Sequence, residues 1–227
     1  MIDLIPTSAR YRNLMLRQVH DFYRYPADYL DSSWLSDDPH WEAIERLWRR
    51  PDSRKIMSDY ILQRCGLAKT MDCDFAASYQ RLPLLAGEAL QRMIMLGGAL
   101  AYSARIPKRA EAVAAPAELH RFAVSKAPFL ARNAPTFCID LGIADWMDQE
   151  AVSQGLRSAG LNMLACALNG VPQSVVKRLA LKLPHAVSGM CDAAFMRQAA
   201  PEQIQEAQRL MLKLYREIDP SCFLLFD

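Results

Sequence analysis

The sequence lacks the short motifs that most enzymes use for phosphate, metal or nucleophile chemistry. It has no glycine-rich phosphate loop, no GxSxG turn, and no HExxH, Walker or Rossmann pattern. Its six cysteines form no CxxC pair, and its four histidines are widely separated. We therefore expect no catalytic residues, no cofactor and no metal site, and an all-helical enzyme with a site assembled from distant residues is kept as an alternative.

Long apolar runs are also missing. The longest near-apolar run is Met93–Tyr102, which is too short for the ~20 residues of a membrane-spanning helix. Residues 1–10 lack the basic start and apolar core of a signal peptide. Several cysteines, such as Cys166, lie in apolar surroundings where a free thiol behaves as a small hydrophobic group. We expect a soluble cytoplasmic protein without direct membrane insertion.

The chain has no block of basic residues. Its net charge is +2, and arginines alternate with acidic residues along the sequence. This pattern is typical of a solvated mixed-charge surface and not of a nucleic-acid binder. The segment 54–74 permits a helix-turn-helix interpretation, but Asp72 and Asp74 would face the phosphates and repel them. Partners therefore include no nucleic acid in our main interpretation, and a helical DNA-binding regulator stays as an alternative.

Apolar residues recur at helical spacing along most of the chain. The pattern predicts an all-α protein, a single compact domain over 1–227 with about seven to nine irregularly packed helices and an apolar C-terminal tail at 219–227. One run, 136–139, has strand character. The predicted helical segments are approximately 7–22, 39–50, 53–65, 87–105, 108–134 as one or two helices, 145–168, 172–183, 185–199 in part, and 201–218.

Glycines and an aspartate carry further local predictions. Gly66 is expected to end a helix in the left-handed conformation. Gly97 and Gly98 lie inside a predicted helix, where each costs about 1 kcal/mol relative to alanine. We expect them to allow a neighbouring helix to approach closely. Asp145 is expected to cap the helix that follows it.

Three tryptophans, Trp34, Trp41 and Trp48, are spaced by seven residues. This spacing places Trp41 and Trp48 near one face of a helix. They form either a stripe of core aromatics or an anchor surface for a partner, because tryptophan and arginine dominate binding hot spots. Arg49 and Arg50 adjoin Trp48. These five residues are the candidate partner-binding site.

Four segments in the same order together resemble the SctK family of type III secretion sorting platforms. Tyr25–Leu30 is similar to the family's PAxYL element, and Arg81–Leu90 with Arg92 is similar to its Leu-rich turn and GEAxRR sequence. Val176–Pro184 resembles KRLxLRLP, and Asp219–Phe226 resembles the terminal PxCxxLF. The region 108–145 matches no family segment that we identify.

The resemblance implies a small helical adaptor of the injectisome without catalytic activity. Members of the family link the inner-membrane ring protein SctD, through its cytoplasmic domain, to the SctQ pod protein, and SctQ connects to SctL and the ATPase. The implied location is cytoplasmic, peripheral at the cytoplasmic face of the inner membrane. No residue-level binding site is carried over from the family.

Overall fold

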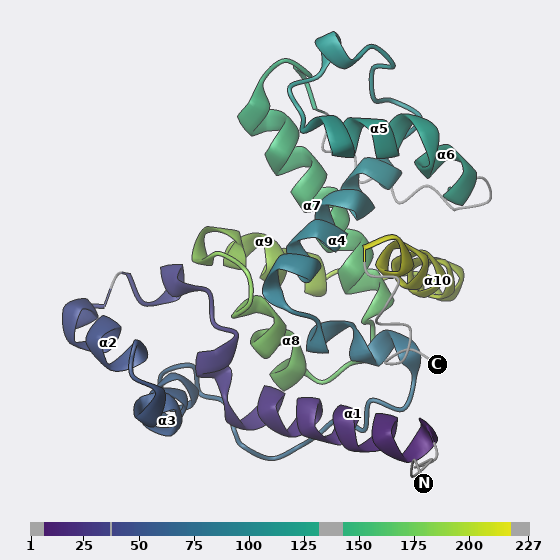
Figure 1. Cartoon of the computed structure of the whole chain (residues 1–227). Coiled ribbons are helices and arrows are strands. Elements are labelled where there is room, and N and C mark those ends of the chain that lie inside the picture. Colours follow the sequence, from purple (N-terminus) through teal and green to yellow (C-terminus); the bar gives the residue numbers. More distant parts are fainter. Residues whose placement is uncertain (1–6, 37, 132–142, 219–227) are drawn as a thin grey trace, which may run out of the picture. The chain divides into compact units, whose positions relative to one another are not determined.

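Helices make up all the regular structure of the described residues, which are 7–36, 38–131 and 143–218 of this computed structural model (Figure 1). The predicted all-α class is confirmed. The α-helices are α1 Thr7–Arg24, α2 Trp41–Trp48, α3 Arg54–Arg64, α4 Gly87–Ala101, α5 Ala117–Ser125, α6 Ala127–Leu130, α7 Gln149–Ala167, α8 Gln173–Ala180, α9 Ser188–Phe195 and α10 Pro201–Ile218. Short 3-10 helices lie between them: η1 Pro26–Asp28, η2 Ser32–Trp34, η3 Pro51–Ser53, η4 Ser78–Leu84, η5 Ala110–Ala112 and η6 His185–Val187.

The described helix count exceeds the predicted seven to nine because several helices are very short. α6 is a single turn of four residues with Pro128 at its start. Because proline has no backbone N–H and fixes φ, it is tolerated in the first turn of a helix and separates α6 from α5. The strand-like run 136–139 and the tail 219–227 lie outside the described residues.

The chain divides into two compact units, each assembled from segments far apart in the sequence. Unit 1 comprises 1–87, 171–188 and 221–227, and unit 2 comprises 88–170 and 189–220. Unit 1 contains α1, α2, α3 and α8, whereas unit 2 contains most of α4 and α9 together with α5, α6, α7 and α10. The single domain over 1–227 stays a prediction beside this division.

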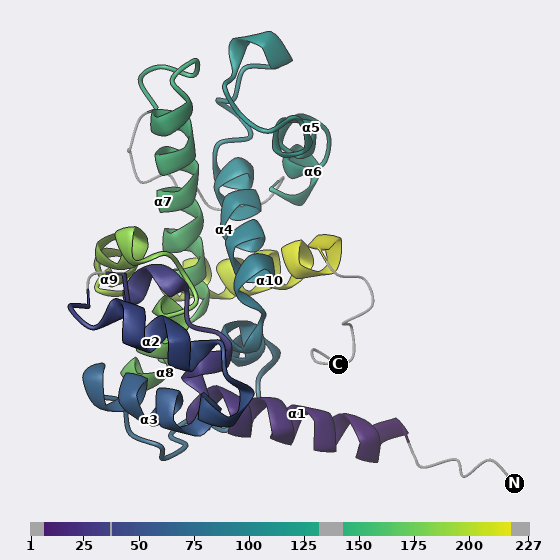
Figure 2. The ribbon, with the colours of Figure 1, turned by 60° about the vertical axis from the view of Figure 1, so that its left-hand side comes forward.

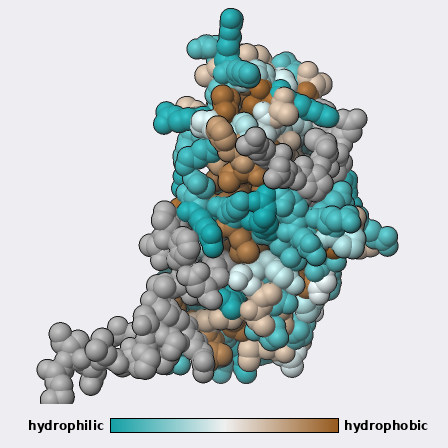
Figure 3. All heavy atoms as spheres, turned by 90° about the vertical axis from the view of Figure 1, so that its right-hand side faces the viewer, coloured by the Kyte–Doolittle hydropathy of each residue, from teal (hydrophilic) through white to brown (hydrophobic). Residues whose placement is uncertain are grey.

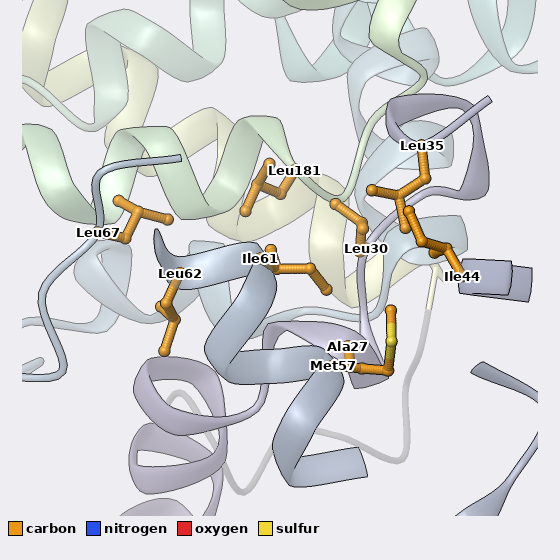
Figure 4. Close-up of a cluster of buried hydrophobic side chains, with 9 residues drawn as sticks. All are labelled: Ala27, Leu30, Leu35, Ile44, Met57, Ile61, Leu62, Leu67 and Leu181. Carbon is orange, nitrogen blue, oxygen red and sulfur yellow. The ribbon is translucent and has the colours of Figure 1, made fainter. Parts of the chain in front are cut away.

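The core of unit 1 gathers side chains from many short elements. One cluster, drawn in Figure 4, joins residues of η1, α2 and α3 with Leu181 at the end of α8. A second cluster contains Phe22 and Tyr23 of α1, Phe75 and Val175. The rings of Phe22 and Tyr29 stack with centroids 5.5 Å apart, and the Tyr29 hydroxyl donates to the Phe22 carbonyl at 2.8 Å. These contacts hold η1 against the end of α1.

The helix α3 ends as the sequence predicts. Gly66 has φ of +61°, and the Leu67 N–H donates to the Leu62 carbonyl at 2.8 Å. A left-handed residue followed by this backward hydrogen bond is the common glycine-terminated helix end. The prediction for Gly66 is confirmed.

The core of unit 2 is built on close contact between long helices. α4 and α7 lie side by side in Figures 1 and 2. A Cβ added at Gly98 would lie 1.9 Å from the Leu156 carbonyl oxygen, and one at Gly160 would lie 1.8 Å from the Ile94 carbonyl oxygen. The prediction that glycines in α4 admit a neighbouring helix is confirmed at Gly98, and Gly160 is its counterpart on α7.

The start of α7 differs from the prediction. Asp148, and not Asp145, caps this helix, and its carboxylate accepts from the N–H groups of Glu150 and Ala151. Asp145 accepts from the Met147 N–H and so stabilises the turn before the helix. Aspartate is a favoured capping residue at either position, and the helix starts three residues later than the sequence pattern predicts.

No helix among the described residues is long and apolar enough to cross a bilayer. On the face drawn in Figure 3, hydrophilic residues cover most of the surface and hydrophobic residues show in small areas between them.

Candidate functional site

The predicted partner-binding residues of α2 divide into two groups by exposure. Trp41 and Trp48 are half-buried and pack against the apolar cluster of Figure 4, on the side of α2 that carries buried Ile44. Arg49 and Arg50 are exposed at the end of the helix. The indoles therefore contribute to the fold and also reach the surface, whereas the guanidinium groups are presented to solvent.

Trp34 lies on a different element. It belongs to η2, and its indole N–H donates to the Leu183 carbonyl at 2.8 Å. Its ring lies 4.6 Å from that of His185, between centroids. The regular spacing of seven residues does not continue as one helix face, because Pro39 and the turn around Asp38 separate η2 from α2.

The charges on α2 and η3 are paired within the chain. Arg49 contacts Glu45 at 2.6 Å, and Arg50 contacts Asp52 at 2.8 Å. The hydrogen bond from Arg50 lowers the pKa of the Asp52 carboxyl, and the same bond raises the pKa of Arg50. Exposed pairs of this kind contribute little to stability, because solvent screens the charges. They can be exchanged for contacts with a partner at little cost.

Asp38 ties the start of α2 to α3. Its carboxylate accepts from the His40 N–H at 2.8 Å, from the Tyr60 hydroxyl at 2.5 Å and from the Arg64 guanidinium. The Asp38 side chain is almost fully buried. A buried carboxylate is stable if its oxygens accept hydrogen bonds from a guanidinium and from polar groups, as they do here. The helix pair α2–α3, which carries Trp41 and Trp48, is therefore held as a rigid element.

A buried lysine, which the sequence reasoning did not single out, connects α8 to the segment before α4. Lys182 donates to the carbonyls of Pro83 and Leu85 at 2.7 and 2.6 Å. Its ammonium lies about 5 Å from the ring centroids of Phe22 and Tyr29. Burial lowers the pKa of Lys182 to about 7. A neutral amine keeps two N–H donors, so both carbonyl bonds survive deprotonation.

A buried arginine lies one turn before Lys182. Arg178 is fully buried, donates to the carbonyls of Ala68 and Ser174, and lies over the ring of Tyr23 at 4.7 Å from its centroid. Its Nε has no hydrogen-bond partner among the described residues. Arg178 thus holds the irregular segment after Gly66 against α1 and α8.

The spacing of Arg178 and Lys182 in the sequence could have indicated that both cations are buried. Arg178 and Lys182 are four residues apart in the segment that resembles KRLxLRLP, and a helix places such residues on one face. The buried Val175 and Leu179 flank that face. A cation inside an apolar face indicates a buried partner, and here the partners are loop carbonyls.

The acidic segment around Cys73 is structural. Asp72 accepts from the Tyr23 hydroxyl at 2.6 Å and from the Ser174 hydroxyl. Burial acts to raise the pKa of Asp72, but these two hydrogen bonds, a backbone hydrogen bond and the charge of Arg178 together lower it. Burial, together with the charges of Asp74 and Asp72, raises the pKa of the Cys73 thiol. A thiol with a raised pKa is a poor nucleophile at neutral pH.

The helix-turn-helix alternative lacks its second helix. Residues 67–77, which follow α3 and Gly66, contain no helix. The would-be recognition segment, 70–75, is held against α1 and α8 through Asp72. A recognition helix is the element that reads the major groove, so this segment does not support DNA binding.

The alternative of a helical enzyme finds little support in the part of the chain that the structure describes. No group of three or more His, Cys, Asp or Glu side chains there is arranged to hold a metal ion. A half-open groove in unit 2 is lined by Ile143, Ala144, Ala151, Gln154, Gly155, Ser158 and Met190. None of these side chains is an acid or a base, which general acid–base catalysis requires.

These features define a class: an all-helical protein that buries cations against loop carbonyls and presents an aromatic and arginine-bearing helix at its surface. The chain belongs to the YscK family, described as YOP proteins translocation protein K, whose family model matches residues 17–227. The predicted membership of the SctK family is thereby confirmed. No curated protein matches the sequence.

One solved structure is similar in fold. It is described as the cytoplasmic domain of the T3SS sorting platform protein PscK from P. aeruginosa. The two are 20% identical and align with a TM-score of 0.60, over 90% of this chain and 96% of that one. This likeness supports the all-helical fold.

Proposed function

We propose that this protein is a non-catalytic adaptor of the type III secretion sorting platform in the cytoplasm. In this role it links the cytoplasmic domain of the inner-membrane ring protein SctD to the SctQ pod protein, and reaches SctL indirectly through SctQ. The observation that carries the proposal is the family match over 17–227, which spans both units. The name and fold of the PscK structure agree with it.

An anchor surface formed by α2, the two residues after it and Trp34 of η2 supports the adaptor role. We define it as Trp34, Trp41, Trp48, Arg49 and Arg50. Half-buried indoles beside exposed guanidinium groups resemble the rigid hot spots of protein interfaces. Asp38 and its partners fix α2, which carries Trp41 and Trp48, so little conformational entropy is lost on binding.

Calorimetry with the purified SctD cytoplasmic domain and with purified SctQ tests the adaptor role. The wild-type chain is expected to bind both. The double variant Arg49→Ala/Arg50→Ala is expected to weaken one of the two partners about tenfold or more, at unchanged thermal stability, because both side chains are exposed.

Arg24→Ala is the matched control, because Arg24 is an exposed arginine at the end of α1 and lies outside the anchor surface. It is expected to bind like the wild type. A wild-type chain that binds neither protein under native conditions contradicts the adaptor role. Unchanged binding by the double variant would instead show that Arg49 and Arg50 lie outside the interface.

A further inference from the structure

The groove in unit 2 runs along one face of α7, between that helix and residues 143, 144 and 190. It has a volume of about 450 Å³. Its α7 residues, Ala151, Gln154, Gly155 and Ser158, share one helix face at spacings of three and four. Leu156 and Gly160, on another face, meet α4. Ile143 before the helix and Met190 on α9 complete the lining.

The short side chains of Ala144, Ala151 and Ser158 form part of the groove lining, and Ile143 occupies the space above Gly155. A Cβ added at Gly155 would lie 2.6 Å from Cγ1 of Ile143, so this isoleucine covers the glycine directly. The lining mixes apolar groups with the neutral polar side chains of Gln154 and Ser158. Such a surface suits an inserted apolar side chain of a partner helix, which can approach closely where residues are small.

The segments that form the groove are acidic. Residues 143–158 and 188–195 contain one basic residue, Arg157, against four acidic ones, and all four acids are exposed. These are Asp145, Asp148, Glu150 and Asp192. Two of them cap backbone N–H groups, yet their charge still acts on the surroundings. These four carboxylates lie on the segments that line the groove but not in the lining itself, and they would attract opposite charge on a partner and repel like charge.

We propose that this groove, the α7 groove, receives a basic amphipathic helix from another protein of the sorting platform. The helix inserts a leucine, methionine or phenylalanine between Met190 and the small face of α7. Lysine or arginine side chains one turn away meet Glu150 and Asp192. The identity of the partner rests on the proposed function, whereas the chemistry of the groove does not.

A labelled synthetic peptide tests the chemistry directly. The probe is an 18-residue fluorescent Leu–Lys amphipathic helix. The full chain is titrated into the peptide, and binding is followed by the rise in fluorescence anisotropy. Gln154→Trp fills the groove from an exposed position, and Gln149→Trp places the same bulk on the opposite side of α7. We expect Gln154→Trp to weaken binding at least tenfold and Gln149→Trp to leave it unchanged.

Charge variants test the contribution of the carboxylates. Glu150→Lys is expected to weaken peptide binding about threefold to tenfold and to reduce its salt dependence. Glu202→Lys is the control, because Glu202 occupies the first turn of α10 as Glu150 occupies the first turn of α7. A Leu–Glu peptide of the same design is expected not to bind.

Three outcomes would overturn the proposal. Peptide binding that survives Gln154→Trp shows that the groove is not the site. Equal binding of the Leu–Glu peptide removes the charge argument. A dimer of the wild-type chain in sedimentation velocity that Gln154→Trp dissociates makes a second copy the occupant. If the wild-type chain binds the peptide but neither SctD nor SctQ, the result contradicts the proposed function and leaves the α7 groove as a binding site.

Discussion

The two units of the chain stabilise their cores in different ways. In the described residues, unit 2 buries no Asp, Glu, Lys or Arg side chain, and its helices α4 and α7 meet at glycines. Unit 1 buries Arg178, Lys182 and Asp38 among short helices and 3-10 turns. One unit depends on close backbone contact, and the other depends on charged side chains that donate to carbonyls or accept from polar groups.

The length of the helices explains this difference. Each helix leaves four carbonyls at its end without an intrahelical partner, so short helices and irregular segments leave proportionally more of them. In unit 1 these are carbonyls such as those of Ala68, Pro83 and Leu85, and the buried cations satisfy them. Unit 2 also satisfies a loop carbonyl with a buried side chain, since the His120 ring nitrogen hydrogen-bonds the Pro107 carbonyl at 2.8 Å.

The largest expected effect sharpens the comparison in unit 1. Arg178→Ala should destabilise the protein by about 3–4 kcal/mol, because it creates a cavity and leaves buried carbonyls unpaired. Lys177→Ala is the control, because Lys177 is the exposed neighbour on the same helix, and it should stay within about 0.5 kcal/mol of the wild type. Urea denaturation followed by far-UV circular dichroism measures both. Equal stability of the two variants would show that the buried arginine does not hold unit 1 together.

The corresponding change in unit 2 is the addition of one methyl group. Gly98→Ala should destabilise by about 2–3 kcal/mol despite the better helix propensity of alanine, because its Cβ meets the backbone of Leu156. Gly189→Ala on α9 is the control, because a Cβ there meets nothing within 4 Å, and it should be neutral or slightly stabilising. The same denaturation experiment applies. If Gly98→Ala behaved like the control, close helix contact would not be the basis of unit 2.

The smallest effect is a pH dependence that arises in unit 1. Lys182 has a pKa of about 7 in the folded state and about 10.5 unfolded, so the unfolded chain binds more protons between these values and stability rises with pH. From pH 6.5 to 8 the rise should be about 1 kcal/mol. The buried thiol of Cys191 and the half-buried thiols of Cys65, Cys73 and Cys166 have raised pKa values, so their effect on stability is opposite but begins only near pH 9.

Lys182→Met removes the titrating group and provides the control for this pH dependence. Its free energy of unfolding, measured by urea denaturation, should be nearly flat from pH 6.5 to 8 while that of the wild type rises. Parallel curves for the two proteins would show that Lys182 does not lose its proton in this range.

Much of the fold follows from local pattern. The helical spacing of apolar residues, the glycine at 66 and the prolines at 51 and 184 placed nearly all the helices of the described residues within a few positions. These signals act within one or two turns of the chain, so a single sequence carries them. The four segments that resemble the SctK family could be recognised for the same reason, because each is a short local pattern.

What the sequence alone determined was therefore the helical class, the family and the positions of most helix ends. Tertiary structure decided the division into two units, the burial of Arg178 and Lys182, and the groove beside α7. Each of these depends on residues that are far apart in the sequence, and Arg178 and Ala68 are separated by 110 positions. Local propensity does not encode which distant carbonyl a side chain reaches, because that distance is set only when the helices pack.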